Sequence, residues 1–251
     1  MNVYLDNNVY VDIEYRELNL LDFISKDNAT YYYSSEIIGE LLEGESVCNL
    51  NQSARIELIE KICGSNCIFP NIEVPVFYIQ SPRWFYDNTT TDLFRIMRRH
   101  LTNNVSNIRP DHDAVLKELS LKRIEINNIS QNDIFNRIDC SLKKSINKFG
   151  VNEYLVKSEA KGRGVYSTLF NLLDAVCYWK DKNGMEVSRM YDASHAYYAQ
   201  LCDYFVTNDK RLSYKARAVY AFLGIKTNVI TSREFVLLKY NKFLLLLRKY
   251  K

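Results

Sequence analysis

The ten residues DYFVTNDKRL, numbers 203–212, decide the fold. The β-prone run Tyr204–Val206 is followed by a polar Thr-Asn-Asp turn, and Lys210–Leu223 then has the apolar periodicity of a helix. A buried strand, a turn ending in an acid and a helix form one repeating unit of an α/β protein. The sequence therefore predicts that Asp209 lies just beyond the carboxyl end of a buried strand.

The amino-terminal part of the chain repeats this strand–turn–helix pattern, with Asp6 directly after the first strand. Gly44 is expected to end one of its helices. The predicted elements are a strand over Asn2–Leu5, a helix over Asn8–Ser25, a strand over Ala29–Tyr33, a helix that begins at Ser34 or Ser35, and a helix over Ser53–Cys63.

The carboxyl-terminal third shows the same alternation. Its predicted elements are helices over Val165–Trp179 and Glu186–Cys202, the strand Tyr204–Val206, the helix Lys210–Leu223, a strand over Thr227–Ile230 and a closing helix over Ser232–Tyr250. Strands that alternate with helices form a parallel sheet covered on both faces. The predicted fold class is therefore α/β, with a core made of residues 1–63 and 165–251.

Residues 64–164 break this pattern and are interpreted as a basic, partly helical insertion into the core. All four prolines of the chain lie here, so the first part is expected to be extended and irregular. Helices are predicted over Asp111–Ile126 and Ser130–Asn147. The clustered bases Arg95, Arg98 and Arg99 are candidates for contact with a polyanionic substrate.

The net charge of +3 is unevenly distributed along the chain. Residues 1–60 carry twelve acids and three bases, a net charge of −9, and the other 191 residues carry +12. An acidic segment that can bind cations, joined to a basic remainder, is typical of a metal-dependent enzyme acting on a polyanion. The alternative is a surface charge that is merely uneven.

Composition excludes several other classes of protein. The longest apolar run, about Phe243–Leu247, is far shorter than the roughly 20 residues of a membrane helix. Six cysteines without a CxxC pair do not form a disulfide scaffold. We therefore expect a cytoplasmic protein with reduced thiols and no membrane association.

Four carboxylates are candidates for one site. Asp6 and Asp209 follow strands, and ligands of open parallel sheets bind beyond the carboxyl ends of strands. Glu40 and Asp192 lie on predicted helices that could point to the same place. Carboxylates this close together need a compensating cation, and hard oxygen ligands select Mg²⁺ or Mn²⁺.

Four stretches of the sequence resemble the PIN-domain nucleases, in the order found in that family: YLDNNV (4–9), ELLEG (40–44), DASHAYYA (192–199) and DYFVTNDKRL (203–212). The resemblance covers about Met1–Cys63 and Val165–Phe235. It implies an α/β/α sandwich in which Asp6, Glu40, Asp192 and Asp209 form the acidic, metal-binding and catalytic quartet. Asn8 and Thr207 match supporting positions of the family, while Asn7 stands where Thr or Ser is more usual. Glu36 and Glu43, one turn away from Glu40, are alternative ligands.

The resemblance implies a metal-dependent endoribonuclease, in which bound Mg²⁺ or Mn²⁺ activates a water molecule for phosphodiester hydrolysis. RNA is the expected substrate, and Arg95, Arg98 and Arg99 are expected to neutralise its phosphates. His195 is expected to pack or to orient a ligand rather than to act as a general base. A free-standing nuclease would also fit a toxin or defence role with a protein inhibitor or antitoxin. The alternatives are a non-catalytic interaction module and a phosphatase acting on a small substrate.

Overall fold

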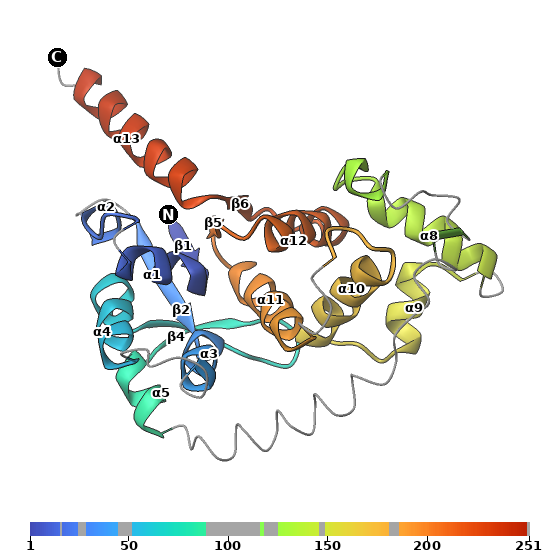
Figure 1. The fold of residues 1–251 in the computed structure, drawn as a ribbon, viewed down its shortest axis with the longest axis horizontal. Helices are drawn as coiled ribbons and strands as arrows, with labels where there is room; N and C mark the ends of the chain where they lie inside the picture. Colours follow the sequence, from blue (N-terminus) through green and yellow to red (C-terminus); the bar gives the residue numbers. More distant parts are fainter. Residues whose placement is uncertain are drawn as a thin grey trace.

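A computed structural model of the chain describes residues 1–15, 17–24, 29–44, 52–88, 116–117, 125–145, 149–180 and 186–249 (Figure 1). Its centre is a six-stranded sheet with the strand order β4-β3-β2-β1-β5-β6. The strands are β1 (Asn2–Leu5), β2 (Thr30–Ser34), β3 (Asn66–Phe69), β4 (Val76–Ile79), β5 (Tyr204–Val206) and β6 (Asn228–Ile230). The α/β class predicted from the sequence is confirmed.

The strand order places a topological switch point between β1 and β5. The chain leaves β1 for β2 on one side, and it later returns to β5 on the other side of β1. Both pairs are parallel, and the β1–β5 register aligns Leu5 with Val206. The residues that follow these two strands, Asp6 and Thr207, therefore emerge side by side, where open parallel sheets bind their ligands.

The described helices connect and cover the strands. They are α1 (Asn7–Glu14), α2 (Leu21–Ile24), α3 (Ser35–Gly44), α4 (Gln52–Cys63), α5 (Pro82–Asn88), the short 3₁₀ helix η1 (Ile126–Asn128), α8 (Ile134–Ser145), α9 (Val151–Lys157), α10 (Arg163–Ala175), α11 (Glu186–Ala199), α12 (Lys210–Leu223) and α13 (Ser232–Lys249). No described helix is both long enough and apolar enough to cross a membrane.

Helices pack on both faces of the sheet. Val3 of β1 is aligned with Tyr31 and Tyr4 with Tyr32, and successive residues of a strand point to opposite faces. Tyr4 contacts His195 of α11, whereas Tyr31 contacts Phe23 of α2 and Phe235 of α13. The sheet is therefore enclosed between two helical layers, which explains why β1 has almost no polar residue.

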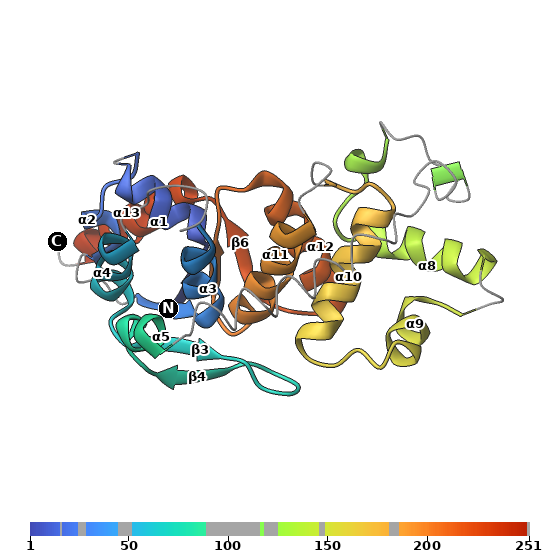
Figure 2. The ribbon, with the colours of Figure 1, turned by 60° about the horizontal axis from the view of Figure 1, so that its bottom comes forward.

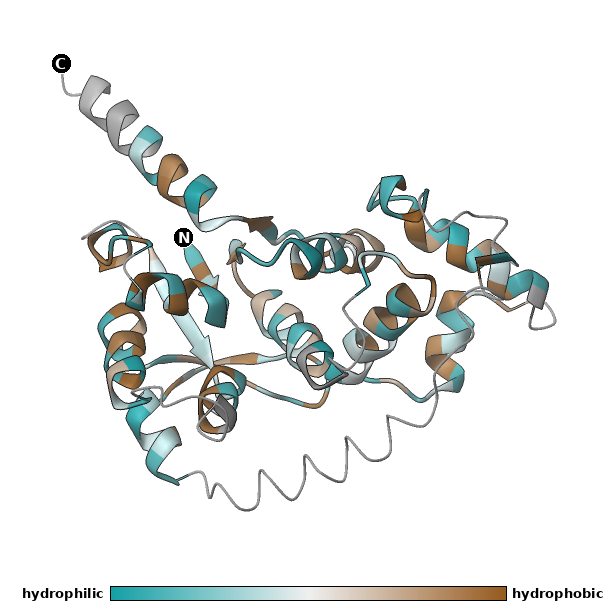
Figure 3. Ribbon diagram, viewed as in Figure 1, coloured by the Kyte–Doolittle hydropathy of each residue, from teal (hydrophilic) through white to brown (hydrophobic). Residues whose placement is uncertain are grey.

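The helices are amphipathic in the way that this layering requires. Along α4, for example, Ile56, Ile59 and Cys63 are buried, and hydrophobic and hydrophilic residues alternate along the ribbon (Figure 3). Fully burying an aliphatic side chain of this size contributes roughly 1.5–3 kcal/mol.

Two features of the sheet differ from the sequence-based predictions. The sheet is not wholly parallel, because β4 runs antiparallel to β3. The connection over residues 70–75 is too short for the crossover that a parallel pair needs. The sheet also continues past residue 63, since β3 and β4 both lie in the segment interpreted as an insertion.

The predicted helix Asn8–Ser25 is divided into α1 and α2. The carbonyl of Asp12 accepts hydrogen bonds from the amides of Glu17 and Leu18, which turns the chain away from the helical path. The side chain of Asn19 then accepts a hydrogen bond from the amide of Leu21 at the start of α2. Such a local side-chain bond favours a new helix start over a continued helix.

The described part of the predicted insertion that follows residue 125 lies beyond α10 and α12 as seen from α1 and α4 (Figures 1 and 2). Helix α8 agrees with the predicted helix Ser130–Asn147 and packs against α12, where the ring centroids of Phe135 and Phe222 are 4.7 Å apart. Most of the predicted helix Asp111–Ile126 lies outside the described residues.

Candidate functional site

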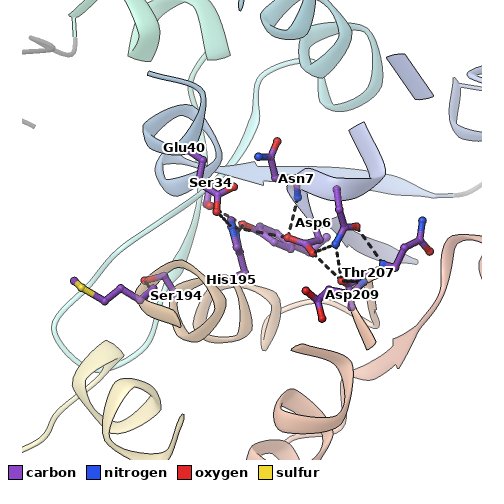
Figure 4. Close-up of polar contacts among 12 residues, drawn as sticks. Asp6, Asn7, Ser34, Glu40, Ser194, His195, Thr207 and Asp209 are labelled. Atoms are coloured by element: carbon purple, nitrogen blue, oxygen red, sulfur yellow. Dashed lines mark hydrogen bonds and ion pairs between the residues drawn. The ribbon is translucent and has the colours of Figure 1, made fainter. Parts of the chain in front are cut away.

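Asp6 lies at the switch point and makes four hydrogen bonds. Its carboxylate accepts three of them, and its backbone amide donates the fourth. It caps α1 by accepting a hydrogen bond from the amide of Asn7 at 2.8 Å on Oδ1. Its Oδ2 accepts from Asn8 Nδ2 at 2.5 Å and from Thr207 Oγ1 at 2.7 Å, while its own amide donates to the carbonyl of Val206. The carboxylate is therefore fixed by both neighbouring strand ends (Figure 4).

Burial makes this carboxylate a weaker acid. Only 4% of Asp6 is exposed. Desolvation raises its pKa from 3.8 to about 6, helped by the charge of Glu40 and opposed by His195 and by the hydrogen bond from Thr207. Asp6 is ionised near neutral pH because cationic and donor groups surround it.

Glu40 of α3 and His195 of α11 meet beside Asp6 (Figure 4). His195 Nε2 lies 3.3 Å from Glu40 Oε1 and 3.9 Å from Asp6 Oδ1. Its other ring nitrogen, Nδ1, lies 2.8 Å from the hydroxyl of Tyr4, which is also 2.7 Å from Ser34 Oγ. The ring is thus oriented by a buried polar chain that begins at Ser34.

The carboxylates keep His195 charged although it is buried. Desolvation alone would lower the pKa of His195, but the charge of Glu40, a hydrogen bond with it, and the charges of Asp6 and Asp192 raise the pKa to about 9. The imidazolium therefore neutralises part of the acidic cluster from within.

Asp209 follows β5 and begins α12. Its Oδ1 accepts hydrogen bonds from the amides of Arg211 and Leu212 at 2.7 and 3.0 Å, an N-cap arrangement. Its amide donates to Thr207 Oγ1 at 3.1 Å, the same hydroxyl that donates to Asp6. The Thr207 hydroxyl thus links Asp6 and Asp209, the acids that follow β1 and β5, through two hydrogen bonds.

Asp192 lies one helical turn before His195 on α11 and contacts a lysine. Its Oδ2 is 4.0 Å from Nζ of Lys215, and Lys215 is also 3.4 Å from Oδ1 of Asp174. Asp174 further forms an ion pair with Arg189 at 3.4 Å. Asp192 therefore belongs to an ionic group that joins α10, α11 and α12.

The structure brings together most of the predicted site residues. Asp6 contacts Asn8, Thr207 and His195, Glu40 contacts His195, and Asp209 is connected to Asp6 through Thr207. Asp192 is electrostatically coupled to His195. The alternative ligand Glu36 instead pairs with Arg163. The side chain of Glu43 and the bases Arg95, Arg98 and Arg99 lie outside the described residues.

The sequence-based prediction missed Lys215, Asp174, Tyr4 and Ser34. A signal for the first two was present, because each is a charged residue within an apolar helical stripe. Lys215 is flanked by Leu212, Ala216 and Val219, which are buried on α12, and Asp174 follows Leu173 on α10. A charge is rarely buried without a partner, so such positions indicate an internal ion pair.

The metal-ligand geometry is incomplete as it stands. The described residues contain no group of three or more His, Cys, Asp or Glu side chains placed to hold a metal ion. The acidic cluster nevertheless retains unused acceptors. Glu40 Oε2 is buried without a hydrogen-bond partner in the described structure, and the two cap bonds of Asp209 use only Oδ1.

Fold and site together define an α/β protein with a buried carboxylate–histidine cluster at the switch point of its sheet. Comparisons with protein-family models, with curated proteins and with solved structures gave no match to this chain.

Proposed function

We propose that this chain is a PIN-like, metal-dependent nuclease that hydrolyses phosphodiester bonds of RNA. One observation supports this most strongly: acids from β1, α3 and the β5–α12 turn, far apart in sequence, gather at the carboxyl ends of adjacent parallel strands. Asp6, Glu40 and Asp209 are three of the four positions that the PIN resemblance assigns to metal binding, and Asp192 is the fourth. A purely structural arrangement does not need unpaired acidic oxygens at this place.

In this proposal, Asp6, Glu40 and Asp209 are the residues that would hold a Mg²⁺ or Mn²⁺ ion. Asp6 Oδ1, Glu40 Oε2 and the second oxygen of Asp209 are hard ligands with spare acceptor capacity, which is what these ions prefer. No described lysine or arginine lies within ion-pair distance of these three carboxylates. A bound ion would lower the pKa of a coordinated water molecule and would neutralise charge on the leaving oxygen.

The protein's own residues position and desolvate these ligands. Asn8 and Thr207 orient the Asp6 carboxylate, and the N-terminus of α12 orients Asp209. His195 is engaged by Tyr4 on one side and by Glu40 and Asp6 on the other, so it orders the carboxylates rather than activating water. Preorganised ligands need no rearrangement during the reaction, which is the main source of catalysis in such a site.

The proposal is tested by incubating the purified protein with single-stranded and structured RNA, with Mn²⁺ or Mg²⁺ and with EDTA. We expect cleavage that requires the metal and that Asp6→Asn reduces by at least about 100-fold, since the variant keeps the shape but removes the charge. Asp203→Asn is a matched control, because this exposed aspartate precedes β5 at the opposite end of the strand. Equal cleavage by the Asp6 variant and the wild type would refute the assigned site.

A second candidate is a non-catalytic interaction module, and one observation favours it. His195 lies between Asp6 and Glu40, and Lys215 lies beside Asp192, so resident cations already offset part of the acidic charge. In this case, Mn²⁺ would neither bind at the cluster nor raise the melting temperature. If the chain is a metal-dependent nuclease, Mn²⁺ at about ten times its dissociation constant should raise the free energy of unfolding by roughly 1.4 kcal/mol.

A further inference from the structure

The two edges of the sheet differ, and among the described residues the edge formed by β4 is open. At the other edge, the side chain of Arg217 on α12 donates hydrogen bonds of 3.1 and 2.7 Å to the carbonyl of Val229 in β6. Figure 2 shows β4 as the outermost strand on its side, where β3 is the only described strand that pairs with it. Natural proteins cover or charge such an edge, because it offers its backbone to another strand.

Alternate residues of β4 turn their backbone groups outward. The amide of Gln80 donates to the carbonyl of Ser65 at 2.9 Å, so these two residues form a hydrogen-bonded pair of the antiparallel ladder. Hydrogen-bonded pairs alternate with pairs that have no hydrogen bonds, and the next one along β4 is therefore at Tyr78. The N–H and C=O groups of Phe77 and Ile79 point away from β3, and no described group bonds to them.

The side chains of β4 are apolar and are exposed on both faces of the sheet. The exposed fractions are 42% for Val76, 45% for Phe77, 52% for Tyr78 and 79% for Ile79. The strand contains neither a charged residue nor a proline that would keep another strand away. Because it has no base to neutralise phosphates, it fits a protein strand and not a nucleic acid.

Antiparallel pairing of β4 with itself satisfies the outward groups in one register. If Tyr78 faces Tyr78 of a second copy, Phe77 lies opposite Ile79, and the outward N–H and C=O groups of both residues find partners. With Phe77 at the centre, Ile79 would face Pro75, which has no N–H. With Ile79 at the centre, Phe77 would face Ser81, whose carbonyl already accepts the first hydrogen bond of α5.

The charges that flank β4 are complementary in the same arrangement. A two-fold antiparallel pair places the residues before β4 of one copy beside the residues after β4 of the other. Glu73, just before β4, is exposed, and Arg83, just after it, forms a long ion pair of 3.9 Å with Glu57. The two-fold therefore brings an acid close to a base at both ends of the paired strands.

We propose that β4 pairs antiparallel with β4 of a second copy of this chain, so that the two sheets become one continuous sheet across a two-fold axis at Tyr78. Phe77 then packs against Ile79 of the other copy on one face, and the two Tyr78 rings meet on the other face. Strands β3 and β2 separate this edge from Asp6 at the end of β1. The inference is independent of the proposed nuclease function.

The oligomeric state of the full chain, measured by light scattering and sedimentation over a range of concentrations, tests this surface. The wild type should be a dimer at a concentration on the order of 50 μM, since pairing of short edges gives a small interface. Ile79→Lys should raise the dissociation constant at least about 30-fold, because a lysine on an edge strand opposes pairing. Ile72→Lys is the matched control: Ile72 is 78% exposed but lies in the loop between β3 and β4, so its substitution should change the dissociation constant less than about threefold.

Disulfide cross-linking tests the register. In the proposed pair, the two Tyr78 residues are directly opposite each other without hydrogen bonds, with Cα atoms about 4.5 Å apart. Tyr78→Cys, in a chain whose Cys48 and exposed Cys140 are replaced by serine, should therefore form a disulfide-linked dimer on mild oxidation. Ile79→Cys in the same background is the control, since its two copies are offset along the strands and lie more than about 7 Å apart.

Three results would overturn the proposal. A wild type that stays monomeric at about 500 μM would leave this edge to another segment or to a peptide. A dimer that Ile79→Lys does not weaken, or that Ile72→Lys weakens equally, would place the contact elsewhere. Equal cross-linking of Tyr78→Cys and Ile79→Cys would contradict the register, and this comparison decides the question even if Ile79→Lys does not fold.

Discussion

At the scale of single residues, the hydroxyl of Thr207 has an unusual position between two acids. It is completely buried, donates to Asp6 Oδ2 and accepts from the amide of Asp209. Thr207→Val keeps the shape and removes these two hydrogen bonds, together with the one that the hydroxyl accepts from Asn8 Nδ2. At pH 8 we expect a loss of about 2 kcal/mol in the free energy of unfolding, because a hydrogen bond to a charged acceptor contributes about 1.5–3 kcal/mol.

The same variant has a predicted pH dependence. The pKa of Asp6 is raised to about 6 by burial, so the carboxyl group is largely protonated at pH 5 and the lost bond is then one between neutral groups. The loss should shrink to about 1 kcal/mol at pH 5 in urea unfolding experiments. Thr227→Val is the control, since the buried hydroxyl of Thr227 donates to the carbonyl of Cys202, which does not titrate. Equal pH dependence of the two variants would contradict this role of Thr207.

The raised pKa of His195 predicts a second dependence of the free energy of unfolding on pH, in which stability falls as the pH rises. Neighbouring carboxylates raise its pKa from 6.5 to about 9, so its contribution to stability is complete below pH 6.5 and is lost as the pH rises through 9. The raised pKa of Asp6 also stabilises the fold at low pH, but this contribution is already lost between about pH 4 and 6. The wild type should therefore lose up to about 3 kcal/mol between pH 6.5 and 9.5.

His195→Gln isolates this contribution. Glutamine cannot take up the proton, so the variant should be less stable than the wild type at pH 6.5 and nearly equal to it at pH 9.5. Urea unfolding at both pH values measures the difference. If the two proteins differed equally at both pH values, the stability contribution of His195 would not depend on its charge.

At the scale of secondary structure elements, Asp209 combines a structural and a chemical role that substitution can separate. Its Oδ1 caps α12, and an asparagine oxygen caps a helix about as well as an aspartate oxygen. Asp209→Asn should therefore change the free energy of unfolding by less than about 0.5 kcal/mol while abolishing Mn²⁺ binding. Asp209→Ala should lose about 1 kcal/mol of stability as well. Loss of the same stability in both variants would indicate that the charge, and not the cap, stabilises α12.

At the scale of the whole molecule, Gly162 lies where the loop between β3 and β4 packs against the start of α10. A Cβ atom at this position would meet the carbonyl oxygen of Ile72 at 2.3 Å, and the backbone has φ +50°. The hairpin is held at the same place by a hydrogen bond from Tyr197 to the carbonyl of Asn71. Gly162 thus permits a close approach between segments about ninety residues apart.

Substitution of Gly162 by alanine should destabilise the protein by about 3 kcal/mol, since it adds a steric clash to the cost of the left-handed backbone. Gly224→Ala is the control for a positive φ without a clash: its φ is +69° and its ψ is +25°, against φ +50° and ψ −120° at Gly162, and no atom lies within 4 Å of the added Cβ. The control should lose only about 1–2 kcal/mol. Thermal or urea unfolding compares the two, and equal losses would mean that the hairpin loop moves away without cost.

The sequence by itself determined the local structure and the candidate acids of this protein. The strand Tyr204–Val206 and the helix Lys210–Leu223 have the predicted bounds, because an apolar run, a capping acid and a helical periodicity are all encoded within a few residues. The acids Asp6 and Asp209 are also found where their strands end. The single long helix predicted over Asn8–Ser25 was wrong, since side-chain and carbonyl bonds near Asp12 and Asn19 interrupt a regular apolar stripe.

Tertiary structure alone decided which strands pair and which charges meet. Nothing in the local sequence of β3 and β4 shows that they extend the sheet beside β2, because pairing depends on contacts between distant segments. The ionic partners Lys215, Asp174 and Asp192 come from three different helices, and His195 reaches Asp6 across nearly two hundred residues. Burial shifts pKa values and selects ion pairs only after the chain has folded, so the charge balance of the site is a property of the three-dimensional structure.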